Sequence, residues 1–203
     1  MEHDALYQSA LLRLRDDIKH FQVEILEDEW NHFARQVSFL NVRAGLQIQN
    51  QARISDIWVF LVSGIAASEQ TWRDGTTTIT RFFTPGDICA NFTSVWRQEI
   101  AADDLIALTD VSGLAFPDQV FRPEYLSGGS FGTYLRLKMI TTHLLDKELL
   151  CAKTSKRIEM RYQFLEEYQK DVIDAVMQKD IARFLGVTPQ GLSRFLKHKN
   201  ECL

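Results

Sequence analysis

The sequence predicts an α+β protein in which an N-terminal β-barrel or jelly-roll domain is followed by a long helix and a C-terminal helix-turn-helix. Three observations support this fold class. Apolar residues alternate with period two between residues 38 and 116, they recur at helical spacing on both sides of that region, and a helix–glycine–helix pattern lies near the C-terminus. The chain has 203 residues, 45% of them apolar, which is enough for two modest domains with buried cores.

The chain is expected to begin with two helices. Apolar residues fall nearly every four positions from Ala5 to His20, and a second short helix is predicted over residues 27–34, with Trp30 and Phe33 facing inward. The helical period ends at Val37, so these helices precede the β region.

Short runs with strand periodicity follow, each bounded by turn residues such as Ala44-Gly45, Asp74-Gly75 and Pro85-Gly86-Asp87. Many short strands at this spacing are typical of a sandwich, jelly roll or small barrel. Residues 118–129, with their proline and paired glycines, are expected to be irregular. The expected strands are Ser38–Val42, Leu46–Gln49, Asp56–Val62, Ala67–Trp72, Thr76–Phe83, Ile88–Phe92, Leu105–Leu108 and Ser112–Phe116.

A long helix is predicted over residues 131–153, because this segment lacks proline and carries two apolar stripes. One stripe has heptad-like spacing, and the other contains Leu137, Ile140 and Leu144. One stripe can pack on the chain's own barrel while the other meets a partner, so we expect a homodimer; the alternative is a buried helix in a monomer. The stripe assigned to the dimer is Leu135, Met139, Thr142, Leu145 and Leu149.

The C-terminal pattern predicts two short helices joined by a tight turn. Gly186 is suited to a left-handed residue that ends the first helix, Thr188 to an N-cap, and Pro189 to the first position of the second helix. This is the layout of a helix-turn-helix, whose second helix enters the DNA major groove. Because helix–glycine–helix corners are common, an ordinary pair of packed helices is the alternative.

The second of these helices has one apolar and one polar side. Leu192, Phe195 and Leu196 form the apolar face. On the polar face, Arg can bond guanine with two hydrogen bonds and Gln can bond adenine likewise, whereas Lys suits phosphates. The predicted DNA-binding residues are Thr188, Pro189, Gln190, Gly191, Ser193, Arg194 and Lys197.

Charge is unevenly distributed along the chain. The whole sequence has 23 Lys and Arg against 27 Asp and Glu, a net charge of −4. Residues 152–203 contain 10 basic and 7 acidic residues, or +3, which leaves 13 against 20, or −7, for the remainder. An acidic sensor domain joined to a mildly basic DNA-binding domain shows this contrast.

Several function classes find no support in the sequence. Cys89, Cys151 and Cys202 occur in no paired motif, which suits a reducing cytosol, and the five histidines show no metal-ligand spacing. No signal peptide and no membrane-spanning apolar run is expected. No Ser/His/Asp or Cys/His set is apparent. We therefore expect a cytoplasmic protein that is not an enzyme and holds neither a metal nor a cofactor.

This order of elements resembles the CRP/FNR family of bacterial transcription regulators over nearly the whole chain. The C-terminal match is the most specific and comprises residues 161–165, residues 178–182 and Ser193-Arg194. In the barrel, the family-like segments are Arg43-Ala44-Gly45, the strand 57–64 that ends in Ser-Gly, the Asp74-Gly75 hairpin and Thr84-Pro85-Gly86-Asp87.

The resemblance implies a cyclic-nucleotide-binding-like sensor domain over residues 1–130, a dimerisation helix over 131–153 and a helix-turn-helix domain over 154–203. It also implies a homodimer that binds a near-palindromic DNA operator and recruits or blocks RNA polymerase. By position, Gln190, Gly191 and Arg194 would face bases. Thr188 would contact a phosphate at the start of the recognition helix. Pro189 departs from the arginine common in the best-known member, so the operator need not match.

The sensor region departs from the family where the cyclic-nucleotide-binding members hold the cyclic phosphate with an Arg-Ser or Arg-Thr pair. Ala101 and Ala102 align with that pair, and Asp103 and Asp104 follow, so a phosphate would meet repulsion. We therefore expect no cyclic AMP binding and an effector, where one exists, that is an unidentified small molecule. The degenerate effector pocket is assigned to Gly86, Asp87, Ile88, Cys89, Ala101 and Ala102.

Three alternatives remain open. A small-molecule-binding module without direct DNA binding would bury or pair Gln190 and Arg194, whereas a regulator would expose them on a basic face. A cupin-like enzyme would need clustered metal ligands on strands, and the expected strands supply none. Cys89 is either a redox switch or a buried small apolar residue. No cysteine precedes Cys89, so the chain lacks the N-terminal iron–sulfur cysteines of the oxygen-sensing members.

Overall fold

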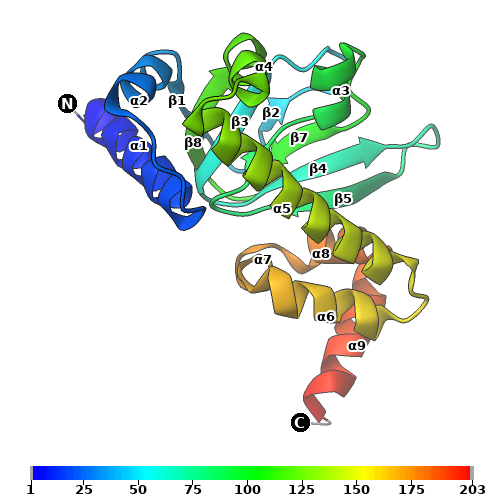
Figure 1. The fold of residues 1–203 in the computed structure, drawn as a ribbon. Helices are drawn as coiled ribbons and strands as arrows, with labels where there is room; N and C mark the ends of the chain where they lie inside the picture. Colours follow the sequence, from blue (N-terminus) through cyan, green and yellow to red (C-terminus); the bar gives the residue numbers. More distant parts are fainter. Residues whose placement is uncertain (1, 202–203) are drawn as a thin grey trace.

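The computed structural model describes residues 2–201 and consists of a β-sandwich crossed by a long helix that leads to a group of C-terminal helices (Figure 1). One antiparallel sheet has the strand order β1-β8-β3-β6, and the other has the order β2-β7-β4-β5. The strands are β1 (Ser38–Val42), β2 (Gln47–Gln49), β3 (Ile57–Ser63), β4 (Ala66–Thr71), β5 (Thr77–Phe83), β6 (Ile88–Cys89), β7 (Asp104–Ala107) and β8 (Val111–Pro117).

The two sheets pack face to face over a common apolar core. Val59 and Ala115 from one sheet and Leu105 and Ala107 from the other belong to the same buried cluster. The barrel form of the prediction is wrong, because the strands within the described residues form two separate sheets and no ladder joins them into a closed cylinder. The turn between β3 and β4 requires glycine at Gly64, since its φ is +81° and a Cβ would lie 2.1 Å from the Asp110 carbonyl oxygen.

Two segments expected to be extended or irregular are helical instead. The predicted strand 88–92 ends at Cys89, and α3 (Phe92–Arg97) begins soon after it. Residues Asp118–Leu126 form α4 despite Pro123. Phe121 of α4 is buried and stacks on Trp58 with a ring separation of 3.8 Å, so tertiary packing outweighs the hydrogen bond that the proline removes.

Helices α1 (Glu2–His20) and α2 (Glu27–Ala34) cover the sheet that contains β1, β8 and β3. Their apolar faces join Trp58 and Phe116 in one core, as the helical spacing predicted. A buried polar contact also ties α1 to the long helix, because Asp17 accepts hydrogen bonds from Lys138 at 2.9 Å and from the Tyr134 hydroxyl at 2.7 Å.

The long helix α5 (Ser130–Thr154) runs diagonally across the sandwich toward the C-terminal helices (Figure 1). Its outward face carries Leu137, Ile140 and Leu144, which are 37%, 57% and 58% exposed. The stripe assigned to the dimer from the sequence faces the chain's own core: Leu135, Met139 and Leu149 are buried, and Thr142 and Leu145 are half-buried.

The C-terminal helices are α6 (Ile158–Tyr168), α7 (Lys170–Ala175), α8 (Gln178–Leu185) and α9 (Pro189–Glu201). They share a core with the outer face of the β4–β5 pair, where Phe82 packs on Phe184 with ring centroids 4.6 Å apart. The helices are therefore docked on the sandwich, although the sequence predicts no contact between these two regions.

The cysteines differ in exposure. Cys89 is fully buried, and burial raises the pKa of its thiol well above the ordinary value, so it fits the description of a small apolar residue better than that of a redox switch. Cys151 is exposed on α5. Cys202 lies outside the described residues.

Candidate nucleic-acid interface and ligand cavity

The corner between α8 and α9 is built from backbone requirements that the sequence satisfies. Gly186 ends α8 in the left-handed conformation, with φ +66°. Thr188 caps α9, since its Oγ1 accepts a hydrogen bond from the Gly191 amide at 3.0 Å. A Cβ at Gly191 would lie 3.2 Å from this oxygen, so a larger residue would press on the cap. The corner thus fixes the direction in which α9 leaves the core.

One side of α9 is buried and the opposite side faces solvent. Leu192 is fully buried, and Phe195 and Leu196 pack against the same core, with Phe195 edge-on to Tyr162 at 5.3 Å. The seven residues predicted to contact DNA lie on the other side. Of these, Gly191 is half-buried, and the exposed ones are Thr188, Pro189, Gln190, Ser193, Arg194 and Lys197.

The polar side chains of this face are available to a partner. Within residues 2–201, Gln190, Arg194 and Lys197 form neither a hydrogen bond nor an ion pair. Thr188 uses an oxygen lone pair for the cap, which leaves its O–H free to donate to a phosphate. Lys199 differs, because it pairs with Glu166 and lies over the Tyr162 ring.

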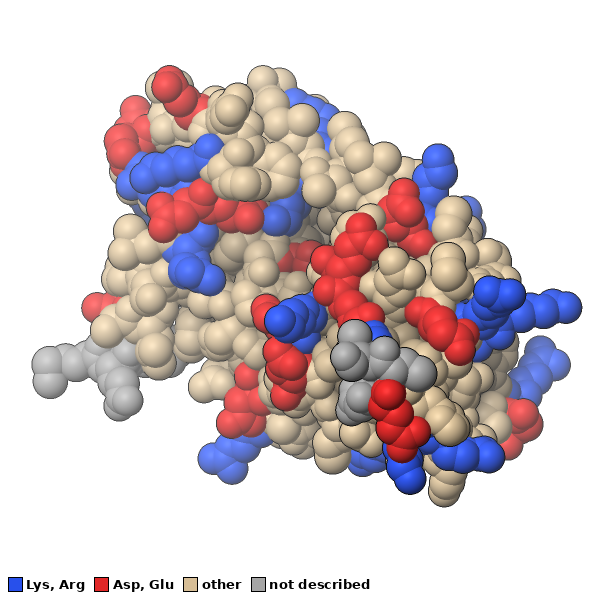
Figure 2. All heavy atoms as spheres, turned by 90° about the horizontal axis from the view of Figure 1, so that it is seen from below, with Lys and Arg blue, Asp and Glu red and all other residues tan. Residues whose placement is uncertain are grey.

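The surface around this face carries both signs of charge. Figure 2, which views the molecule from below, shows Lys and Arg side chains interspersed with Asp and Glu. A regulator was expected to present a basic face here, but the basic side chains occur among acidic ones.

A polar contact that sequence analysis missed holds α8 against the sandwich. Arg183 forms an ion pair with Glu69 of β4, donates to the Thr77 hydroxyl at 2.5 Å, and pairs with Asp180 at 3.1 Å. Nearby, Gln169 donates to the Phe82 carbonyl at 3.2 Å. Arg183 and Glu69 are 114 positions apart, so no local pattern could have indicated their pairing.

Lys153 links the end of α5 to β5. Its Nζ donates to the carbonyl oxygens of Ile79 at 3.2 Å and Thr80 at 2.7 Å, and it lies 4.2 Å above the Phe184 ring. Burial lowers the pKa of Lys153 from 10.5 to about 8, because the charged ammonium is less well solvated there than in water.

Replacing Lys153 with methionine is expected to change the pH dependence of stability. Between about pH 8 and pH 10 the unfolded lysine holds a proton that the folded one has released, so the contribution of Lys153 to the free energy of unfolding rises with pH. Urea unfolding at several pH values in this range should show that the free energy of unfolding of the wild type increases relative to that of Lys153→Met as the pH rises. If the free energy of unfolding depends on pH in the same way in both proteins, the lowered pKa of Lys153 is contradicted. Cys89 and the tyrosines are present in both proteins, so their contributions cancel when the two free energies are subtracted.

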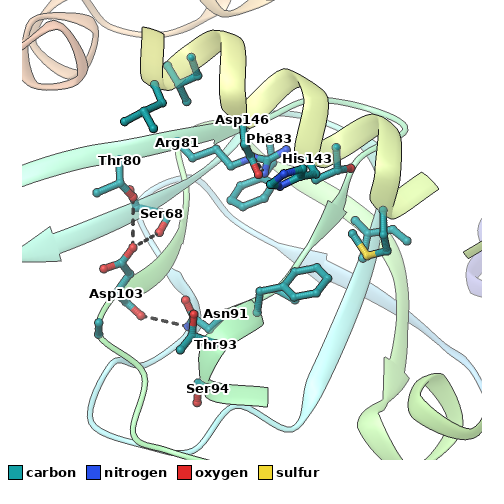
Figure 3. A pocket seen from close by; sticks show the side chains of 18 of the residues that line it. Ser68, Thr80, Arg81, Phe83, Asn91, Thr93, Ser94, Asp103, His143 and Asp146 are labelled. Atoms are coloured by element: carbon teal, nitrogen blue, oxygen red, sulfur yellow. Dashed lines mark hydrogen bonds and ion pairs between the residues drawn. The ribbon is translucent and has the colours of Figure 1, made fainter. Parts of the chain in front are cut away.

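A cavity of about 660 Å³ lies between the sandwich and α5 (Figure 3). Of the residues assigned to the effector pocket from the sequence, Ile88 and Ala102 line this cavity, whereas Gly86, Asp87, Cys89 and Ala101 do not. Asp87 instead accepts the Thr84 amide at 2.8 Å within its own turn, and Cys89 and Ala101 are buried in the protein. Residues of β4, β5, α5 and the segment before β7 supply the polar lining, among them Ser68, Thr80, Arg81, Asp103, His143 and Asp146.

The charged residues of the cavity lie in two groups. Arg81 pairs with Asp146 of α5 at 2.6 Å and lies 4.8 Å above the Phe83 ring. Burial raises the pKa of Asp146, and Arg81 opposes that shift. Asp103 lies away from this pair in Figure 3 and accepts hydrogen bonds from the hydroxyls of Ser68 and Thr80.

The described residues contain neither a candidate metal site nor a candidate membrane-spanning helix. No group of three or more His, Cys, Asp or Glu side chains in residues 2–201 is arranged to hold a metal ion. In the same part of the chain, no helix combines the length and the apolar character needed to cross a membrane.

Comparison with known proteins identifies the fold. No model of a protein family matches the chain, and no curated protein matches it. Among solved structures, FixK2 from Bradyrhizobium japonicum has a TM-score of 0.68 at 17% identity, covering 81% of this chain and 85% of that chain. A protein from Eubacterium rectale, described as a transcriptional regulator of the crp/fnr family, has a TM-score of 0.60 at 16% identity, covering 86% and 83%.

The chain has the fold of the CRP/FNR regulators. The resemblance expected from the sequence is confirmed at this level. A cyclic nucleotide-binding domain containing protein from Listeria monocytogenes also has this fold, with a TM-score of 0.64 at 15% identity, and the match covers 93% of this chain and 91% of that chain. These matches cover most of the chain.

Proposed function

We propose that this protein is a DNA-binding transcription regulator of the CRP/FNR type, a homodimer that binds a near-palindromic operator. In this proposal residues 1–130 form the sensor domain, 131–153 the dimerisation helix and 154–203 the helix-turn-helix domain. The regulator contacts RNA polymerase and acts in the cytoplasm. Its sensor domain does not bind cyclic AMP, since Ala101 and Ala102 replace the phosphate-binding pair.

The observation that carries the proposal is the polar face of α9. Gln190 and Arg194 are exposed and form no side-chain hydrogen bond or ion pair within the described residues, and Leu192 on the other side of the helix is buried. These two side-chain types are suited to base edges, and the N-terminal end of a recognition helix is where base contacts occur. A packing role for α9 explains its apolar side, so the proposal rests on the presence of Gln and Arg side chains near the N-terminal end of its exposed side.

The experiment is selection of binding sites from a random pool of duplex DNA with the purified, ligand-free protein at fixed salt. A palindromic motif with half-sites about 10 base pairs apart supports a dimeric regulator. If no motif is enriched either without additives or in the presence of the small-molecule fraction of a cell extract, the DNA-binding function is rejected. The alternative, a small-molecule-binding module without direct DNA binding, then stands.

The outward stripe of α5 supports the dimer. Leu137, Ile140 and Leu144 follow the 3-4 spacing of a heptad seam, and Cys151 continues it seven positions after Leu144. The stripe is exposed in the monomer, whereas the opposite side of the helix is buried. In a parallel pair of helices related by a twofold axis, each seam residue faces its own counterpart.

This geometry predicts that Cys151 forms a disulfide across the dimer axis. Mild oxidation of the full chain in a Cys202→Ser background should give a covalent dimer on a non-reducing gel, and Cys151→Ser should abolish it. Cys89 serves as the internal control, because it is buried and its pKa is raised, and it should not react in the folded protein. Cross-linking that survives the loss of Cys151 would contradict the proposed seam.

A further inference from the structure

The cavity beside α5 contains one carboxylate that no cation of the described chain neutralises. Asp103 Oδ2 accepts hydrogen bonds from the Ser68 hydroxyl at 2.5 Å and the Thr80 hydroxyl at 3.1 Å. Within residues 2–201, nothing donates to its Oδ1 and no Lys or Arg pairs with it. Two hydroxyls hold the side chain in position but bring no positive charge, so the carboxylate has unused capacity as an acceptor.

The two cations of the cavity are already engaged elsewhere. Arg81 is paired with Asp146 at 2.6 Å, and Lys153 donates to the carbonyl oxygens of Ile79 and Thr80. An anionic ligand would share Arg81 with Asp146, whose carboxylate would repel it. A cationic ligand meets Asp103 without breaking any of these contacts, and a hydrogen bond between charged groups is stronger than a neutral one.

The rest of the cavity favours a ligand with an apolar body. Phe83, Met139, Leu149 and Leu150 contribute apolar walls to a space of about 660 Å³. A cavity of this size, mostly apolar with a few placed polar groups, suits a small organic molecule and is far larger than a bare ion requires.

We propose that this cavity binds a small organic amine, with its ammonium group on Asp103 and its apolar body against Phe83, Met139 and Leu149. This inference deepens the proposed function by naming the class of effector. It rests on that function only for its regulatory consequence, because ligand binding is measured without DNA.

The test uses three probes that share one apolar body, 3-phenylpropylamine, 3-phenylpropan-1-ol and 3-phenylpropanoate, titrated into the full chain at neutral pH by calorimetry. The amine is expected to bind about 10-fold more tightly than the alcohol, as a hydrogen bond to a charged group implies. The carboxylate is expected to bind most weakly. Tightest binding of the carboxylate, equal affinity for all three probes, or binding of none would overturn the inference.

Two isosteric variants locate the charge that is recognised. Asp103→Asn still accepts the Ser68 and Thr80 hydroxyls, so it should fold with an unchanged melting temperature while the amine loses its advantage of about 10-fold over the alcohol. The matched control Asp146→Asn removes the other carboxylate of the cavity and should leave that advantage in place. Loss of the amine preference in Asp146→Asn alone would overturn the assignment to Asp103. Amine binding without any DNA motif would reject the proposed function and leave this inference intact.

Discussion

Replacing Leu144 with glutamate is expected to convert the dimer to a monomer and to remove specific operator binding. Leu144 is 58% exposed in the single chain and lies in the centre of the proposed seam, so the substitution places two carboxylates opposite each other at the twofold axis. An uncompensated buried charge costs about 3–5 kcal/mol, which corresponds to a loss of at least about 100-fold in dimer affinity. Sedimentation velocity at micromolar concentration measures the change.

Leu12→Glu is the matched control for this experiment. Leu12 is 62% exposed on α1, and it lies neither on the outward stripe of α5 nor among the residues that line the cavity. This variant should remain dimeric and bind the selected operator. If Leu144→Glu is dimeric, or if both variants dissociate alike, the outward stripe of α5 is not the dimer interface.

Arg194→Ala is expected to weaken binding to the selected operator by about 1–3 kcal/mol and to relax the base preference at one position in each half-site. Arg194 has no partner among the described residues, so its removal should not destabilise the fold. Fluorescence anisotropy on the selected duplex and on its single-base variants gives both quantities, and a thermal melt checks folding.

Lys197→Ala is the control for this prediction. Lys197 is exposed on the same helix but is suited to phosphate, so its loss should weaken all sequences about equally and reduce the salt dependence by about one ion per half-site. If Arg194→Ala leaves the base preference unchanged at every position, α9 does not read bases through this side chain.

Most element positions could be predicted from local patterns. Short apolar runs located β1, β3, β5 and β8 to within one residue, because turn residues bound each run in the sequence. The corner at Gly186 and Thr188 was also predictable, since only certain residues tolerate its backbone. Helices α3 and α4 were not predicted from the sequence. In α4, the packing of Phe121 on Trp58 stabilises the helix despite its proline.

The candidate site divides in the same manner. The polar face of α9 follows from helical periodicity, and the structure places all of its predicted residues away from the core. The ligand cavity does not follow from any pattern. Its lining comes from β4, β5, the segment from β6 to α3, the segment before β7 and α5, and the motif that resembles the family's ligand cassette contributes only in part.

The sequence by itself predicted the order of elements and the resemblance to CRP/FNR regulators, and through that resemblance it predicted that Ala101 and Ala102 replace a phosphate-binding pair. Each of these depends on residues that are neighbours in the chain. The tertiary structure alone decided which stripe of α5 faces solvent and how Arg183 holds α8 against the sandwich. It also showed that Asp103 lines a cavity without pairing with a Lys or Arg of the described residues. All three depend on contacts between residues that are far apart in sequence. For α5, both sides of the helix carry apolar residues, so the sequence does not indicate which side packs against the core.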